Sequence, residues 1–129
     1  MNKIYIETSA GELIDKITIL EIKKEKIDDQ KKLEIINKEY SSLKTSLEKN
    51  LKVNDKLKNF WKKLKDINLK LWEIEDGKRL AEKNKNFDEK FIELSRNVYK
   101  YNDQRAKIKS DINQLSGSHI KEIKQYTKY

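Results

Sequence analysis

The three arginines of this sequence are its clearest candidates for chemistry. The chain carries 30 basic residues, and three of them, Arg79, Arg96 and Arg105, are arginines. Where lysine is used so heavily, an arginine marks a position that needs a planar guanidinium with five donors, which an ammonium cannot replace. Such a group binds a carboxylate or a phosphate through two parallel hydrogen bonds. We therefore expect these arginines to bind an acidic side chain or an anionic ligand.

Two helical patterns place further polar residues close to the arginines. Arg105 occupies a position in an apolar repeat, one turn from Tyr101 and beside Asn102. A second line of polar and aromatic residues recurs at spacings of four, three and four, which puts its members on one helix face; these are Asn68, Trp72, Glu75 and Arg79. The candidate anion site consists of Asn68, Trp72, Glu75, Arg79, Arg96, Tyr101, Asn102 and Arg105.

Two kinds of partner fit this candidate site. An internal acid is the more common outcome for an arginine on a helix seam, and Glu75, Glu21 and Asp103 are suitable acids. The alternative is a small anion, such as a sugar phosphate, a nucleotide or a carboxylate, held between the third and fourth helices. Substituting Arg79 and Arg105 by lysine separates the two, because loss of binding without loss of stability indicates a ligand.

Several classes of chemistry lack the residues that they need. The chain has no cysteine and one histidine, His119, so thiolate or histidine-rich metal sites and thiol nucleophiles are excluded within a single chain. No glycine-rich loop of the phosphate-binding kinds is present. We predict no catalytic residue, no cofactor and no metal, and we expect a protein that is not an enzyme.

The elements that position these residues must be helices. Three glycines and no proline leave almost no turn signals, which argues against a many-stranded sheet. Periodicity predicts one all-α domain over 1–129, an antiparallel bundle or paired hairpins with seams of coiled-coil spacing. The expected helices cover 10–28, 30–49, 54–83 and 88–116, followed by a tail over 118–129. The side-chain types of residues 3–7 alternate along the chain as they do in a short β-strand, so we predict a strand there.

Local signals define several helix ends. Ser9 and Glu12 have the spacing of a capping box at the start of the first helix. Asp88 can cap the fourth helix, with Phe87 packed on Ile92 as a hydrophobic staple. Gly117 can end the fourth helix in the left-handed conformation.

The first helix is apolar on two sides. Leu13, Ile14 and Ile17 lie on one face, whereas Ile19 and Ile22 lie on the far side. This pattern predicts either a central position or a subunit interface. We expect a homo-oligomer, with a dimer favoured, that associates through this helix. No apolar run is long enough to span a membrane, and we expect a cytoplasmic protein.

The positive charge is concentrated in the segment 51–70, which holds seven lysines and two aspartates. A basic amphipathic helix can bind phosphate backbones nonspecifically, so nucleic acid is a further candidate partner. The alternative is that these lysines lay their methylene groups along a buried face and keep their charges in water. We favour this alternative because the same face is needed for the core and the segment has no arginine for bidentate contacts.

The sequence resembles an uncharacterised family of short bacterial and phage proteins that is defined as a domain of unknown function. The resemblance covers nearly the whole chain and contributes no mechanism. It is carried by Ser9–Leu13, Asp15, Lys16, Ile19–Lys23, Leu71–Asp76, Phe87, Asp88, Phe91, Ile92, Arg96–Tyr99, Asn102, Asp103, Arg105, Ala106, Lys109, Ile112, Asn113, Gly117, Ser118 and Glu122–Tyr126. Lys78 departs from the pattern where an apolar residue is usual, and Ile123 departs where a second acid follows Glu122, which puts an acidic role of the tail in doubt.

The leading hypothesis from the sequence is a self-associating helical interaction or accessory protein. It is motivated by the first helix, whose apolar residues surround it without an obvious second layer in the chain to cover them.

Overall fold

Four helices make up the ordered framework of the protein. The computed structural model describes residues 2–129, and its helices are α1 (Ala10–Lys26), α2 (Gln30–Asn50), α3 (Asp55–Asn84) and α4 (Glu89–Ser116). Each observed boundary lies within two residues of the one expected from the periodicity. The all-α class is therefore confirmed.

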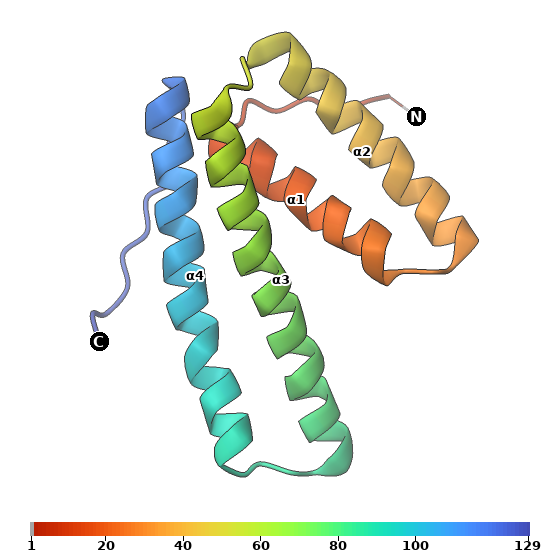
Figure 1. Ribbon diagram of the computed structural model, residues 1–129, viewed down its shortest axis with the longest axis vertical. Helices are drawn as coiled ribbons and strands as arrows, with labels where there is room; N and C mark the ends of the chain where they lie inside the picture. Colours follow the sequence, from red (N-terminus) through yellow and green to blue (C-terminus); the bar gives the residue numbers. More distant parts are fainter. Residues whose placement is uncertain (1) are drawn as a thin grey trace.

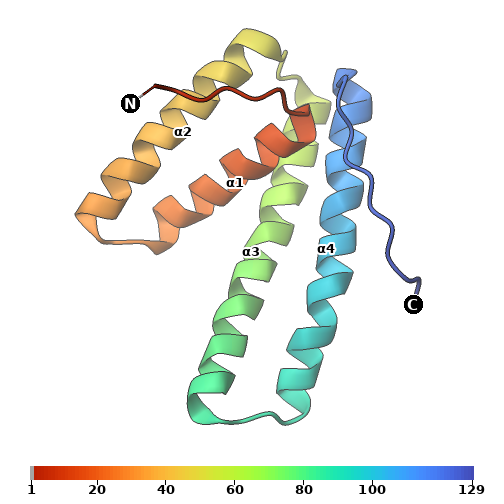
Figure 2. The same cartoon turned by 180° about the vertical axis from the view of Figure 1, so that it is seen from behind.

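The helices pair into two antiparallel hairpins of different length. Figure 1 shows α3 and α4 side by side as a long hairpin, with the shorter α1–α2 hairpin against one side of its upper half. The lower half of the α3–α4 hairpin projects beyond α1 and α2, as the view from behind in Figure 2 also shows. Residues after Ser116 run beside α4 without regular structure. We call residues 118–129 the C-terminal arm.

The hydrophobic core lies where the two hairpins meet. Its fully buried members come from all four helices: Ile14 and Ile17 of α1, Leu47 of α2, Leu64 of α3 and Ile112 of α4. α1 contacts each of the other three helices. The core is formed only when α1 lies between α2 and the long hairpin.

Side-chain caps define where the helices begin and end. Asp29, Asn54 and Asp88 each accept hydrogen bonds from backbone amides of the first turn that follows. Gly117 ends α4 with a φ of 66°, the left-handed conformation expected for it. The ring of Phe87 packs edge to face on Phe91, with 5.2 Å between the ring centroids.

Two predictions at the N-terminus need correction. The strand over 3–7 is wrong, since no strand occurs within residues 2–129 and Ile4 is 90% exposed. The capping box at α1 is only half formed. Ser9 accepts a hydrogen bond from the amide of Glu12, but the Glu12 carboxylate instead binds Lys109.

The two apolar faces of α1 are covered within the chain. Ile22, on the far side from Leu13, is 1% exposed. The sequence left open whether α1 is central or lies at a subunit interface, and in this structure it is central. None of the four helices is both long and apolar enough to cross a bilayer in the described part of the chain.

Candidate functional site

An ion pair between α1 and α4 is the centre of a buried polar cluster. Asp15, on the second turn of α1, has a side chain that is 1% exposed. Arg105 of α4 donates from Nε to Asp15 Oδ1 at 2.9 Å and from Nη2 to Oδ2 at 2.5 Å. These are the two parallel bonds that a guanidinium makes with a carboxylate. Arg105 therefore binds an internal acid.

α3 contributes a neutral donor to the same carboxylate. Asn68 Nδ2 lies 2.9 Å from Asp15 Oδ1 and 2.9 Å from Thr18 Oγ1. The Thr18 hydroxyl donates to the Asp15 backbone carbonyl, so it is oriented to accept from Asn68. Three helices thus converge on one buried acid.

A second buried charge lies one turn further along α4. Lys109 Nζ binds Glu12 of α1 at 2.8 Å and Glu122 of the C-terminal arm at 2.9 Å. The side chain of Lys109 is 8% exposed, although lysine is rarely buried unless it is paired. We call the set Glu12, Asp15, Thr18, Asn68, Arg105, Lys109 and Glu122 the charge cluster.

The charge cluster is possible because α1 and α4 approach closely. A Cβ built on Gly11 would lie 2.5 Å from the Lys109 carbonyl oxygen and 2.8 Å from Asn113 Oδ1. The Gly11 amide donates to Asn113 Oδ1 at 2.7 Å, and the Ala10 amide donates to the Ser118 hydroxyl at 2.9 Å. Residues from α4 and the arm therefore satisfy free amides at the start of α1.

The protonation states of the cluster follow from these contacts. Burial raises the pKa of Asp15, but the hydrogen bonds from Arg105 and Asn68 outweigh burial and leave this pKa below its ordinary value. Burial lowers the pKa of Lys109, but the hydrogen bonds that Lys109 donates to Glu12 and Glu122 raise this pKa above its ordinary value. All three groups, Asp15, Lys109 and Arg105, are held in their charged forms. A carboxylate or amine kept fully charged and fully bonded is poorly suited to transferring protons near neutral pH.

The structure brings together part of the candidate anion site expected from the sequence. Arg105 and Asn68 meet at Asp15, and Asn102 Oδ1 lies 3.4 Å from Arg105 Nη1. Tyr101 is partly buried beneath Lys70, whose Nζ lies 5.2 Å from the ring centroid. No buried side-chain nitrogen or oxygen within residues 2–129 lacks a hydrogen-bond partner.

The remaining members of that candidate site lie elsewhere. Arg79 pairs with Glu75 at 2.8 Å on the exposed, projecting half of α3, and the Arg79 side chain is 79% exposed. Trp72 is partly buried on the same helix, and Arg96 is exposed on α4. These residues do not converge on the guanidinium of Arg105.

The acidic partner of Arg105 was not among the acids expected from the sequence. Of those acids, Glu75 binds Arg79, and Glu21 accepts a hydrogen bond from Trp61 Nε1 at 2.7 Å. Sequence reasoning also missed Lys109. One weak signal for Asp15 was available, namely its position next to Ile14 and two residues before Ile17, which are on the buried face of α1.

A second feature is an open groove between α3 and α4. No residue of α1 or α2 lines it. Its floor contains Phe60, Ile67, Ile108 and Leu115, and its rims are polar. We call it the outer groove; its lining residues are Lys56, Asn59, Phe60, Lys63, Asp66 and Ile67 of α3, Lys100, Asp103, Gln104, Lys107, Ile108, Asp111, Gln114 and Leu115 of α4, and Tyr129.

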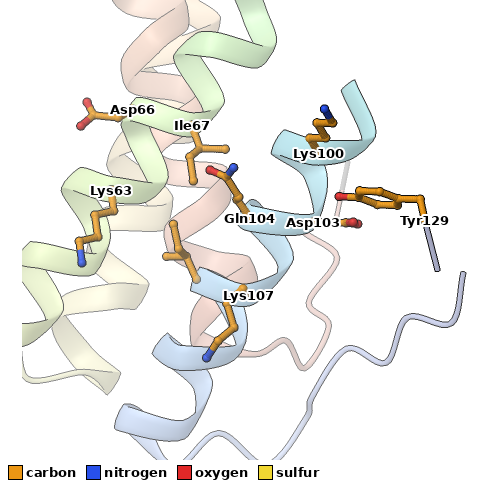
Figure 3. Close-up of a pocket in the computed structure, with 9 residues that line it drawn as sticks. Lys63, Asp66, Ile67, Lys100, Asp103, Gln104, Lys107 and Tyr129 are labelled. Carbon is orange, nitrogen blue, oxygen red and sulfur yellow. The ribbon is translucent and has the colours of Figure 1, made fainter. Parts of the chain in front are cut away.

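Figure 3 shows the part of this groove that residues 63–67 of α3 and 100–108 of α4 line. Ile67 of α3 and Gln104 of α4 face each other between the helices, and the hydroxyl of Tyr129 points to Asp103. The Tyr129 ring also contacts Tyr99 edge to face, with 4.8 Å between centroids. The end of the C-terminal arm therefore lies against α4 at one edge of the groove.

Neither feature offers a metal site. Across residues 2–129 no three acidic or histidine side chains gather closely enough to hold an ion. The carboxylates of the charge cluster are instead neutralised by Arg105 and Lys109.

The chain belongs to a family of unknown function, DUF6165, whose model matches residues 4–129. No curated protein and no solved structure matches it significantly. The family resemblance seen in the sequence is thereby confirmed.

Proposed function

We propose that this chain is a non-enzymatic helical interaction protein that associates with a second copy of itself. The observation that carries the proposal is the outer groove, an apolar-floored surface that the chain's own helices leave uncovered. Phe60 and Ile108 are only partly buried there, and Leu115 is 38% exposed. Packing these side chains against another helix pair removes apolar area from water, which favours association.

The location of this surface differs from the one expected from the sequence. α1 was the expected interface, but Ile14, Ile17 and Ile22 are buried within the chain and have little area left to offer. The outer groove is available for a partner without any unfolding. We therefore assign association to α3 and α4.

The charge cluster supports a structural role over a ligand-binding one. The two parallel donors of the Arg105 guanidinium both bind Asp15. The Lys109 ammonium binds the carboxylates of Glu12 and Glu122. An incoming anion would have to displace an internal carboxylate that is already paired, which costs desolvation without a net gain of hydrogen bonds. Anion binding between α3 and α4 is therefore the weaker alternative.

Nucleic-acid binding through residues 51–70 has less support than self-association. Lys65 of this segment binds Glu25 at 2.7 Å, and Lys63 lies beside Asp66 on the groove rim. Acids beside these two lysines lower the local positive potential that would attract a phosphate backbone. A cytoplasmic setting and a bacterial or phage source are parts of the proposal that rest on the sequence.

The concentration dependence of the solution mass tests the proposal. Sedimentation velocity over a range of micromolar concentrations is expected to show a species of twice the 15.5 kDa chain mass that grows with concentration. A single 15.5 kDa species at every concentration would contradict self-association. Binding to DNA or RNA that weakens steeply with salt would instead support the nucleic-acid alternative.

A further inference from the structure

We infer that two copies pack their outer grooves face to face about a two-fold axis, with α3 antiparallel to the partner's α3 and α4 antiparallel to the partner's α4. This inference rests on the proposed self-association and specifies its surface and register. It begins from the charges on the rims, which have both signs. A groove made for an acidic helix would carry a basic rim, whereas Asp66, Asp103 and Asp111 are spread among the lysines here.

The charges on α3 are self-complementary. Lys63 and Asp66 are three residues apart on one helix face, and both are exposed. In a two-fold interface, residue i meets residue j of the partner while j meets i. An axis that crosses α3 between Leu64 and Lys65 therefore places Lys63 opposite the partner's Asp66. The same axis places Lys56 opposite the partner's Glu73.

α4 shows a matching pattern around an axis between Arg105 and Ala106. This axis places Lys100 opposite the partner's Asp111, and Gln104 opposite the partner's Lys107. All four residues line the outer groove. Opposite charges therefore meet on both helices in the same antiparallel arrangement.

One straight axis can serve both helices. Lys70 of α3 lies over the ring of Tyr101 of α4, which fixes the two helices relative to each other. The first axis lies 5.5 residues back along α3 from Lys70. Counting equally far along α4 from Tyr101 reaches a point between Ala106 and Lys107, one residue beyond the α4 axis. The mismatch of about 1.5 Å along the helix is small beside the reach of lysine side chains.

Most of the charged side chains that would form these contacts make no ion pair within the described residues. The ion pairs of the described residues involve neither Lys56, Lys63, Asp66, Glu73 nor Lys100. Asp111 binds Lys107, and the exposed side chain of Lys107 lets that pair exchange partners. The apolar floor supplies the attraction, because exposed ion pairs contribute little energy, and the charges select the register.

The size of the face suits a modest dimer. From Lys100 to Leu115 the groove runs about 24 Å along α4, and it is two helices wide. Stable interfaces bury about 800 Å² per partner, so this face is at the small end of that class. We expect a dissociation constant in the micromolar range. The arrangement completes a four-helix bundle from two hairpins.

Charge reversal with rescue tests the arrangement. Lys63→Glu places two acids opposite each other at both symmetry-related positions, and Asp66→Lys does the same with two bases. Each single variant is expected to weaken dimerisation about tenfold or more by sedimentation. The double variant Lys63→Glu/Asp66→Lys restores opposite charges and is expected to dimerise within about threefold of the unmodified chain.

Matched controls separate register from net charge. Lys58→Glu and Asp76→Lys make the same charge changes on α3 at exposed positions outside the groove, and we expect neither to change dimerisation by more than about twofold. Circular dichroism confirms that each variant is folded. Single reversals that behave like the controls, or a double variant as weak as the singles, would overturn the inferred interface while leaving self-association intact. A monomeric unmodified chain would overturn the proposed function itself.

Discussion

Asp15 and Arg105, ninety residues apart in sequence, form a bidentate ion pair that joins α1 to α4. Asp15 is almost fully buried, and Asn68 of α3 completes its hydrogen bonds. A buried pair of this kind gives little net stability compared with an apolar pair, but it penalises every packing that separates its partners. We therefore expect it to specify how the short hairpin sits on the long one.

Asp15→Asn is expected to destabilise the fold by about 3 kcal/mol, because it leaves the partly buried Arg105 without its counter-charge. Urea unfolding followed by circular dichroism measures the change. Asp76→Asn removes an exposed acid and is expected to change the free energy of unfolding by less than about 0.5 kcal/mol. Equal effects of the two substitutions would show that the Asp15 pair has no special role.

Arg105→Lys keeps the positive charge but removes the planar guanidinium and its two parallel donors. We expect a loss of about 1–2 kcal/mol, since an ammonium cannot make both parallel bonds to Asp15. The same unfolding measurement applies, with Arg79→Lys as the control because Arg79 makes only an exposed pair within α3. A fully stable Arg105→Lys protein that no longer binds a small anion would support the ligand-binding alternative instead.

Gly11→Ala is expected to destabilise the protein by about 1–3 kcal/mol. Its Cβ would overlap the backbone carbonyl of Lys109, which cannot move without separating α1 from α4. At Gly77 the nearest atom is a terminal methyl of Leu94 at 3.1 Å, which can rotate away. Gly77→Ala should therefore gain helix propensity and be neutral or stabilising by up to about 1 kcal/mol. Thermal melts of the two variants measure these changes in stability. A Gly11→Ala protein as stable as the unmodified chain would show that the fold does not require the close approach of α1 to α4.

Stability should fall on acidification through Asp15. Its pKa is lower in the folded chain than the ordinary value of 3.8, so the unfolded state binds more protons. The stabilisation is fully present above the unfolded pKa and is lost as the pH falls through the folded pKa. The pKa of Glu122, lowered by its hydrogen bond with Lys109, contributes with the same sign.

Denaturant melts between pH 7 and pH 2 check this dependence. The stability difference between the unmodified chain and Asp15→Asn should shrink toward the acidic end. The raised pKa of Lys109 acts at the other extreme, where stability is lost only as the pH rises through the folded pKa, above 10.5. Two curves that stay parallel down to pH 2 would mean that Asp15 is not held charged by the fold.

The helices could be predicted from local sequence because their signals are local. Asp29, Asn54 and Asp88 precede apolar repeats, and each caps the helix that begins after it. Gly117 similarly ends α4. The predicted strand failed because alternation over five residues needs a partner strand, and residues 2–9 have none.

The candidate site was only partly predictable because its partners are distant in sequence. Arg105 and Asn68 were identified from their polar character on helix seams. Asp15 was not matched with them, since the rotation of α1 against α4 is set by packing around Gly11, which no local pattern reveals. Lys109 is one of many lysines, and only its burial distinguishes it.

Contacts between two copies across the outer groove test the proposed interface most directly. In a sample that mixes isotope-labelled and unlabelled chains, filtered nuclear Overhauser spectra detect only contacts between copies. We predict such contacts at the methyl groups of Ile67, Ile108 and Leu115, and none at α1. Contacts confined to α1 or α2, or no contacts in a sample that sediments as a dimer, would contradict the assignment of the interface to α3 and α4.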